Sequence, residues 1–319
     1  MMTHALILGG SGFFGKSILD AYKNGLLNEQ GVDQITIVSR NASELKNSHP
    51  HLLGRSINLI NADLSTCVTL PSADLVIHGA ASTDAARYVL YPEGEKRNVL
   101  LGVSHFCRLA RTHFRDSKIL FVSSGAVYGH YPHEIEQIDE DYACNEQDKI
   151  EDSKYIYTSA KRECEVLIQQ LGSDGLDVSI ARCFAFVGKY LPRDQHFAIG
   201  NFIRDGLNQE PVVVKATSPV YRSYMHAHDL ASWLMTIAFA ANPSAPIFNV
   251  GSDESISIQE LGQKIARYFG VGSIVSPINN GNINRYVPSI AKAKKELRLT
   301  LKMNLDQAID ATIKSIKGL

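Results

Sequence analysis

The chain has 319 residues, of which 45% are hydrophobic and 20% charged, so it can bury a full core in one large or two interleaved domains. Its 32 Lys and Arg balance 33 Asp and Glu, and a net charge of -1 offers no electrostatic footprint for nucleic acid or an anionic membrane. These values predict a globular protein whose partner is a small molecule.

The cysteines are widely spaced and include no C-x-x-C pair, so the sequence indicates neither a disulfide framework nor a zinc site. No apolar run approaches the ~20 residues that a membrane helix needs, and the N-terminus lacks a basic segment before its apolar residues. We therefore expect reduced thiols in a cytoplasmic protein that binds neither membrane nor metal. The cysteines are Cys67, Cys107, Cys144, Cys164 and Cys183.

The N-terminal stretch predicts a strand, a phosphate-binding turn and a helix. Residues 5–8 are apolar, glycines follow at positions 9, 12 and 15, and a helical pattern continues until Gly25. Gly9 would allow a sharp exit from the strand, Gly12 would let the backbone approach a pyrophosphate, and Gly15 would let the helix lie close to the sheet. The phosphates would meet unpaired N–H groups at the helix N-terminus. A tight turn without a ligand is the alternative, because a glycine motif alone is a weak signal.

Short apolar or β-branched runs then alternate with helical patterns through the first half of the chain. Helical periodicity covers residues 93–113 and 155–171. Such alternation is typical of an α/β fold with a Rossmann-type, doubly wound parallel sheet, which binds ligands beyond the carboxyl ends of its strands. The further strands are expected over residues 34–38, 57–60, 74–78, 118–123 and 177–181.

From about residue 184 the chain becomes irregular and rich in Gly, Pro and Asn. Ser257 and Glu260 have capping-box spacing at the start of one expected helix. Other helices are expected to begin near residues 199 and 229, apolar runs cover residues 212–214 and 247–250, and a last short helix follows residue 289.

This change of pattern suggests two interleaved domains. We interpret residues 1–183 as a dinucleotide-binding Rossmann domain, to which residues 224–252 contribute a late helix and strand. Residues 184–319 would mainly form a smaller substrate-binding domain. Folded over the sheet, it would close a cleft at the carboxyl edge.

Tyr157 and Lys161 are four residues apart in a helical pattern, so they share one face of the helix. A phenol has a pKa near 10, and its use as a base near pH 7 requires about 3 units of depression, which a neighbouring ammonium and an oxidised nicotinamide can supply. Ser124 ends the preceding strand and is placed to hydrogen-bond a substrate oxygen. The expected core stripe of this helix is Ala160, Cys164, Leu167 and Leu171.

Several stretches together resemble the extended short-chain dehydrogenase/reductase family, in particular its nucleotide-sugar epimerases, dehydratases and reductases. They are the three-glycine turn, VIHGAA at residues 76–81, SSGAVYG at 123–129, and the Tyr157 and Lys161 pair. The stretches at 222–229 and 285–288 also resemble the second domain of that family, so the likeness covers nearly the whole chain.

The resemblance implies a role for each matching residue. Tyr157 would be the acid/base, Lys161 would hold the ribose and bias Tyr157, and Ser124 would polarise the reacting carbonyl or hydroxyl. Arg222 would clamp the pyrophosphate of a nucleoside-diphosphate sugar, with Asn201 as a weaker candidate for the same substrate. Besides Tyr157 and Lys161, the cofactor would contact Gly9, Ser11, Gly12, Phe13, Phe14, Gly15, Ser39, Arg40, Asp63, Leu64, Ala80 and Ala81.

Three departures from the family pattern bear on the reaction. Ser39 and Arg40 stand where many NAD-dependent members carry an acid, which favours NADP and leaves NAD possible. Gly125 and Ala126 replace the Asp-Glu pair of the dehydratase branch, so elimination of water lacks its expected acids. Ala185 replaces the usual Asn after the sixth strand, which leaves the details of phosphate contact open.

Other conspicuous side chains have structural interpretations. His78 ends a strand, and we favour a role in satisfying backbone groups over catalysis. Tyr155 lacks the four-residue spacing to Lys161, and Trp233 is expected in the core. Surface or core positions suit the remaining histidines of interest better than metal binding: His196, His226 and His228.

The sequence thus predicts an NAD(P)-dependent nucleotide-sugar oxidoreductase that reduces a 4-keto-6-deoxy sugar. A 4-epimerase that retains its cofactor is the nearest alternative, and a homodimer is possible. A third alternative, an NADP sensor without chemistry, would need only the glycine turn, so the combination of Ser124, Tyr157 and Lys161 argues against it.

Overall fold

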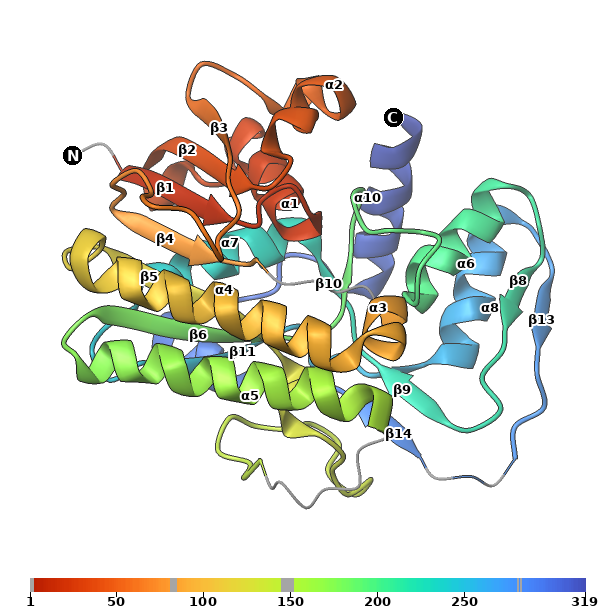
Figure 1. Cartoon of the computed structure of the whole chain (residues 1–319). Helices are drawn as coiled ribbons and strands as arrows, with labels where there is room; N and C mark the ends of the chain where they lie inside the picture. Colours follow the sequence, from red (N-terminus) through yellow and green to blue (C-terminus); the bar gives the residue numbers. More distant parts are fainter. Residues whose placement is uncertain (1–2, 81–84, 145–151, 280, 282) are drawn as a thin grey trace.

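The computed structural model describes residues 3–80, 85–144, 152–279, 281 and 283–319. Within them, a seven-stranded parallel sheet has the order β11-β6-β5-β4-β1-β2-β3 (Figure 1). This is the predicted Rossmann-type α/β fold. The strands are β1 (Thr3–Leu8), β2 (Val32–Ser39), β3 (Ile57–Asn61), β4 (Leu75–His78), β5 (Lys118–Ser124), β6 (Asp177–Cys183) and β11 (Ile247–Val250).

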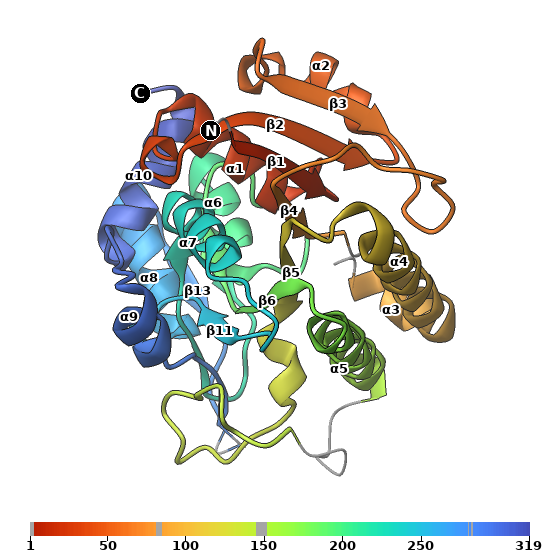
Figure 2. The ribbon, with the colours of Figure 1, turned by 90° about the vertical axis from the view of Figure 1, so that its left-hand side faces the viewer.

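Helices cover both faces of the sheet, as Figure 2 shows. On one face lie α4 (Pro92–His113) and α5 (Asp152–Ser173), and on the other lie α1 (Phe13–Lys23) and α7 (Ala227–Phe239). Alternate residues of each strand point to opposite faces, so Leu6 packs in one hydrophobic cluster and Ile7 in the other. The sheet is therefore packed between two hydrophobic clusters, one on each face, which fix the positions of the strand ends.

Residues after 184 form three small sheets beside the large one. β7 (Phe186–Val187) pairs with β10 (Met225–His226), and β8 (Val212–Val214) pairs with β13 (Ser273–Val275). The third sheet has the order β12-β9-β14, from β9 (Val220–Arg222), β12 (Ile256–Ser257) and β14 (Asn284–Tyr286). Helices α6 (Ala198–Leu207) and α8 (Ile258–Phe269) gather with β8 and β13 at one end of the molecule (Figure 1).

Most expected elements are confirmed to within a few residues, including the capping box of Ser257 and Glu260. The helix after residue 289, α9 (Ala291–Leu297), is not the last, because α10 (Leu305–Lys317) follows it. The stripe predicted for α5 also needs one change, since Ile168 is fully buried where Leu167 is only partly so. The remaining short helices are η1 (Asn28–Gln30), η2 (Ala42–Glu44), α2 (Leu45–Ser48), η3 (Pro50–Leu52), α3 (Ala85–Leu90) and η4 (Gly125–Tyr128).

Candidate active site

The glycine turn lies at the carboxyl edge of the sheet, between β1 and α1. Gly9 has φ +82°, and a Cβ there would lie 2.5 Å from the Cα of Ala80, so only glycine fits. Gly15 must also be glycine, because a Cβ at this position would collide with the backbone of Gly10. The absence of a Cβ lets α1 begin close against the turn that follows β1.

Three observations fit a dinucleotide at this turn. The N-cap of α1 is Gly12, which has no side chain to cap the helix, and the first turn contains no acid. A Cβ on Gly12 would meet only the carbonyl oxygen of Gly9, at 3.8 Å, so the space above it is open. In addition, the Oγ of Ser39, at the end of the neighbouring strand β2, is buried and has no partner among the described residues. A phosphate and a ribose hydroxyl would satisfy these groups.

The aromatic residues that open α1 are packed against the protein. The rings of Phe13 and Phe14 lie 5.6 Å apart, and Phe14 lies 5.6 Å from Phe186 of β7. They fix the start of α1 against β7, and any contact with a cofactor would come from their backbone. Ser11 lies partly exposed in the turn.

The predicted adenine end of the site is at the ends of β2 and β3. Asp63 accepts two hydrogen bonds from Ser65, at 2.8 and 2.6 Å, which lower the pKa of Asp63 with a smaller contribution from nearby Arg40. Arg40 is exposed at this edge, and Leu64 is buried. Ala80 lies against Gly9, while Ala81 falls outside the described residues.

Ser124 lies where β5 ends. Its Oγ accepts a hydrogen bond from the N–H of Ala126 at 3.1 Å and thereby caps η4. The same Oγ lies 3.5 Å from the Oη of Tyr286, on β14. The serine hydroxyl is thus at the junction between the large sheet and the β12-β9-β14 sheet.

Tyr157 and Lys161 lie one turn apart on α5 and face the same edge. The Tyr157 ring is half-buried and makes an edge-to-face contact of 5.2 Å with Tyr88 of α3. Lys161 is only 5% exposed, and its Nζ donates to the carbonyl of Val122 at 3.1 Å while lying 5.1 Å above the Phe121 ring. The ammonium is therefore fixed against β5, where a neighbouring phenol or a ribose can reach it.

The residues after Ser124 are not acids. A Cβ on Gly125 would lie 2.7 Å from Cζ of the Phe184 ring, and the next residue is Ala126. With Phe184 where it lies, glycine fits position 125, and a larger residue there would require this ring to move.

A buried polar network that the sequence did not predict lies beneath the site. Glu165 accepts hydrogen bonds from Ser123 at 2.5 Å and from Arg182 at 3.1 and 2.8 Å. The Arg182 guanidinium also lies 4.8 Å above the Tyr128 ring. Glu165 comes four residues after Lys161, so a continued four-residue spacing along α5 was the available signal.

His78 has no backbone partner, contrary to expectation. Its ring lies 4.8 Å from that of Phe106 and 5.6 Å from that of Phe121, and neither ring nitrogen has a partner among the described residues. Burial, with a smaller contribution from Lys161, lowers the pKa of His78 to about 4. The side chain is a neutral histidine in an aromatic layer under the site.

Arg222 lies on β9 without an acidic partner among the described residues. Its guanidinium donates to the carbonyl of Tyr221 at 2.7 Å and to the Oδ1 of Asn284 at 2.9 Å, and burial lowers its pKa. It also lies 5.7 Å from the centre of the Tyr286 ring, which connects it to Ser124. An anion would be its natural complement.

Asn201 lies in the first turn of α6, at some distance in the chain from these groups. Its Nδ2 donates to the carbonyl of Gln195 at 2.8 Å, and its buried Oδ1 has no partner among the described residues. Among those residues no hydrogen bond joins it to Arg222 or Ser124. The structure thus places Arg222 near Ser124 through Tyr286, whereas Asn201 makes no direct hydrogen bond to either residue within the described chain.

The other singled-out residues are structural. His226 accepts from the N–H of His228 and caps α7, while His228 lies 2.8 Å from Asp20. Trp233 donates to the carbonyl of Thr300, and Tyr155 is 41% exposed. The described residues contain no group of three or more His, Cys, Asp or Glu placed to hold a metal ion. None of the five cysteines forms a disulfide with another described residue.

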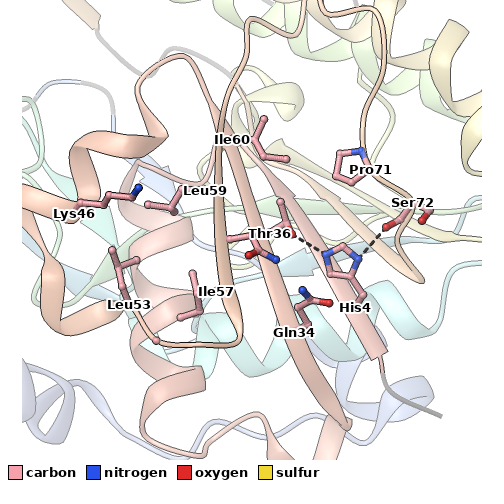
Figure 3. A pocket seen from close by; sticks show the side chains of 12 residues that line it. His4, Gln34, Thr36, Lys46, Leu53, Ile57, Leu59, Ile60, Pro71 and Ser72 are labelled. Atoms are coloured by element: carbon pink, nitrogen blue, oxygen red, sulfur yellow. Dashed lines mark hydrogen bonds between the residues drawn. The ribbon is translucent and has the colours of Figure 1, made fainter.

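A hollow of about 850 Å³ lies over the outer strands of the sheet and is lined by residues of β1 and β2 and by β3 from Ile57 to Ile60 (Figure 3). The His4 ring lines it, held between the carbonyl of Ser72 and the Oγ1 of Thr36 at 2.9 and 2.8 Å. None of the predicted site residues lines this hollow, so it is distinct from the site described here.

Comparisons with known proteins agree with this arrangement. UDP-glucuronic acid decarboxylase 1 of Xenopus tropicalis is 25% identical over 312 residues, which cover 97% of this chain and 70% of the relative. The dTDP-4-dehydro-6-deoxyglucose reductase of Escherichia coli is 26% identical, with 98% and 97% covered. The structure of UDP-glucose 4-epimerase from Thermotoga maritima is 19% identical and has a TM-score of 0.80 over 99% of both chains.

In the described part of the chain no helix is long and apolar enough to cross a bilayer. The family model described as NAD dependent epimerase/dehydratase family matches residues 5–251, which is well over half of the sequence. The chain therefore belongs to the NAD-dependent epimerase/dehydratase family of enzymes, within the extended short-chain dehydrogenase/reductases.

Proposed function

We propose that this enzyme reduces a 4-keto-6-deoxy sugar carried on a nucleoside diphosphate, with NADPH as the preferred reductant. The observation that carries the proposal is the combination of Ser124, Tyr157 and Lys161 with Gly125, a position that carries no acid and over which Phe184 packs. This group suits proton transfer to a carbonyl oxygen but lacks acids for the elimination of water. The Escherichia coli relative named as a reductase of a 4-dehydro-6-deoxy sugar supports the same reaction.

In this proposal each side chain has a defined task, and Lys161 has two. Tyr157 donates a proton to the developing alkoxide, and Ser124 donates a hydrogen bond to the same oxygen. Lys161, fixed by the carbonyl of Val122, stabilises the phenolate that remains and binds the ribose. The bound cofactor supplies the hydride. The glycine turn and the orphan hydroxyl of Ser39 would hold the cofactor.

The substrate is assigned to residues 184–319, which we propose act mainly as a substrate-binding domain. Arg222 would pair with the pyrophosphate, because a buried guanidinium without a carboxylate is satisfied by a doubly charged anion. Asn201 would be a secondary contact on α6. We also propose a cytoplasmic location, in keeping with described cysteines that form no disulfide.

Exposed apolar side chains on the α4 and α5 face support a homodimer. Leu101 is 54% exposed and Val166 is 52% exposed, and Val89 and Leu90 of α3 lie 64% and 68% exposed. Such a face is normally covered by a partner. We expect sedimentation to give a dimer that Leu101→Glu dissociates, and a monomeric wild-type protein would contradict this.

A panel of sugar nucleotides tests the reaction. The pure enzyme is incubated with NADPH and 4-keto-6-deoxy sugar nucleotides, and we expect consumption of NADPH with one 4-hydroxy product. UDP-glucose without added cofactor and UDP-glucuronate serve as competing substrates. Conversion of UDP-glucose to its 4-epimer would favour the epimerase alternative, to which the putative UDP-glucose 4-epimerase of Methanocaldococcus jannaschii, 26% identical, points. Release of carbon dioxide would instead indicate a decarboxylase.

A further inference from the structure

Tyr286 connects two parts of the structure that the proposed reaction needs. It lies on β14, and its Oη is 3.5 Å from the Oγ of Ser124, which is 162 residues earlier in the chain. The same Oη donates a hydrogen bond to the carbonyl of Cys183, at the end of β6, at 3.4 Å. The Tyr286 hydroxyl, from the β12-β9-β14 sheet, thus lies beside the ends of two strands of the large sheet, β5 and β6.

The protons of this contact can be assigned. The Oγ of Ser124 already accepts from the N–H of Ala126, so its own O–H is free to donate. Tyr286 has one O–H, which goes to the carbonyl of Cys183, so its oxygen accepts from Ser124. Burial raises the pKa of Tyr286, which keeps this phenol protonated. In the enzyme without substrate, Ser124 therefore donates a hydrogen bond to Tyr286, and Tyr286 donates one to the carbonyl of Cys183.

The hydroxyl contacts are long, whereas the ring is well held. O–H···O bonds have their usual length near 2.7–2.8 Å, so contacts of 3.5 and 3.4 Å are weak. The ring packs 4.6 Å from that of Phe184, and the Arg222 guanidinium lies 5.7 Å from its centre. A substrate oxygen can thus displace the hydroxyl contact while the ring stays in place.

We propose that Tyr286 is a positioning residue that orients the Ser124 hydroxyl toward the reacting oxygen of the substrate. When that oxygen arrives, the Tyr286 O–H turns from Cys183 to the Oγ of Ser124, and the serine O–H then donates to the substrate. A serine that accepts two hydrogen bonds is a stronger donor. Because Arg222 lies against the same ring, binding of the pyrophosphate by Arg222 would also fix the position of Tyr286. The inference rests on the proposed function.

A double-mutant cycle tests the action through Ser124. Tyr286→Phe, Ser124→Ala and the double variant are compared in kcat and KM, with a sugar nucleotide that the wild type converts and saturating cofactor. Tyr286→Phe keeps the ring, so we expect kcat to fall about 10-fold or more with KM changed less than about twofold. In the Ser124→Ala background the same change should have no further effect.

Tyr131→Phe is the matched control. Tyr131 lies in the same aromatic cluster, but its hydroxyl accepts from the N–H of Val287 at 3.2 Å and does not touch Ser124. Its removal should change thermal stability but leave kcat within about twofold. An equal loss from Tyr286→Phe in both backgrounds, or no loss in either, would overturn the positioning role.

Binding of a nucleoside diphosphate tests the link to Arg222 without turnover. Tyr286→Leu removes the ring, and calorimetry with UDP and dTDP should show about fivefold weaker binding, whereas Tyr286→Phe should bind as the wild type does. Unchanged binding by Tyr286→Leu would overturn the link. Failure of the proposed function would appear differently, as a wild-type enzyme that leaves the ketone panel unreacted.

Discussion

Ser123 and Ser124 are adjacent at the end of β5, yet they belong to two very different regions. Successive strand residues point to opposite faces, so Ser123 points to α5 and Ser124 to the other face of the sheet. Ser123 is 3% exposed and makes a 2.5 Å hydrogen bond to Glu165. Ser124 meets Tyr286 at 3.5 Å. Ser123 thus belongs to a region whose buried polar groups are paired, and Ser124 to a region in which some polar groups are not. We call these the saturated and the unsaturated region.

The saturated region includes Glu165 and Arg182, whose side chains are 7% and 9% exposed and paired with each other. Buried polar groups that are fully paired fix one geometry. The unsaturated region holds the orphan hydroxyl of Ser39 and the Arg222 guanidinium, which lacks a carboxylate among the described residues. Polar groups that the fold leaves unpaired are those that a ligand can complete. This difference suggests that the paired network around Glu165 keeps the site in one geometry. The unpaired groups are the ones that would bind ligands and take part in the reaction.

Breaking the saturated region should have the largest effect, and it should be on stability. Glu165→Ala leaves the Arg182 guanidinium buried and unpaired, so we expect a loss of about 3–5 kcal/mol in the free energy of unfolding. Asp174→Ala is the control, because it breaks the exposed pair with Arg111, whose side chains are 43% and 39% exposed, and should cost about 0–1 kcal/mol. Denaturant titration measures both, and equal losses would contradict the comparison.

Low pH should decrease the free energy of unfolding through His78, which lies in the aromatic layer under the site. The folded pKa of His78 is about 4, below the value near 6.5 that histidine has when unfolded. As pH falls from 6.5 to 4 the unfolded chain binds a proton that the folded chain does not, so stability decreases by about 3 kcal/mol from this residue.

Unfolding at a series of pH values checks the acid effect. His78→Leu should flatten the profile in this window. The exposed His133, changed to Gln, should leave the profile as it is. A wild-type stability that stays constant from pH 6.5 to 4 would refute the prediction.

Breaking the unsaturated region should affect turnover instead of stability. Tyr157→Phe removes only a hydroxyl from a half-buried ring, so the fold and cofactor binding should survive while kcat falls about 10²-fold or more. Tyr155→Phe, on the exposed neighbour, is the control and should keep full activity. Near wild-type turnover by Tyr157→Phe on a verified substrate would remove Tyr157 from the proposed mechanism.

Cofactor choice should depend on the edge of β2. Arg40→Ala would remove the charged contact that we propose Arg40 makes to a 2′-phosphate, so the NADPH dissociation constant should rise by about 10- to 100-fold, equivalent to about 1.5–3 kcal/mol. NADH binding should be nearly unchanged. Fluorescence titration measures both cofactors, and a wild type that prefers NADH would show that Arg40 does not select NADP.

The smallest expected effect is at Arg222. Arg222→Lys keeps the charge but loses the planar fork, so KM for the sugar nucleotide should rise about 5- to 10-fold while cofactor affinity stays the same. Steady-state kinetics and cofactor titration separate the two constants. Equal weakening of cofactor binding would place Arg222 at the dinucleotide instead of the substrate.

Local signals in the sequence determined much of this structure. The glycine turn, the sheet strands and the Ser257 cap each depend on residues within one turn or one strand of each other. Tyr157 and Lys161 share a helix face because four residues make about one turn. Such features follow from backbone geometry and short-range periodicity, which a sequence displays directly.

Only the tertiary structure decided which distant groups meet. Tyr286 reaches Ser124 across 162 residues, and Arg182 reaches Glu165 from another element. Phe184 fills the space over Gly125, and His78 lies among aromatic rings without a hydrogen bond to the described chain. These contacts form because the packed layers bring segments together that are far apart in the sequence. Local periodicity does not show which of these segments will meet. Short-range patterns in the sequence therefore predicted candidate reactive residues, whereas packing determined what surrounds each of them.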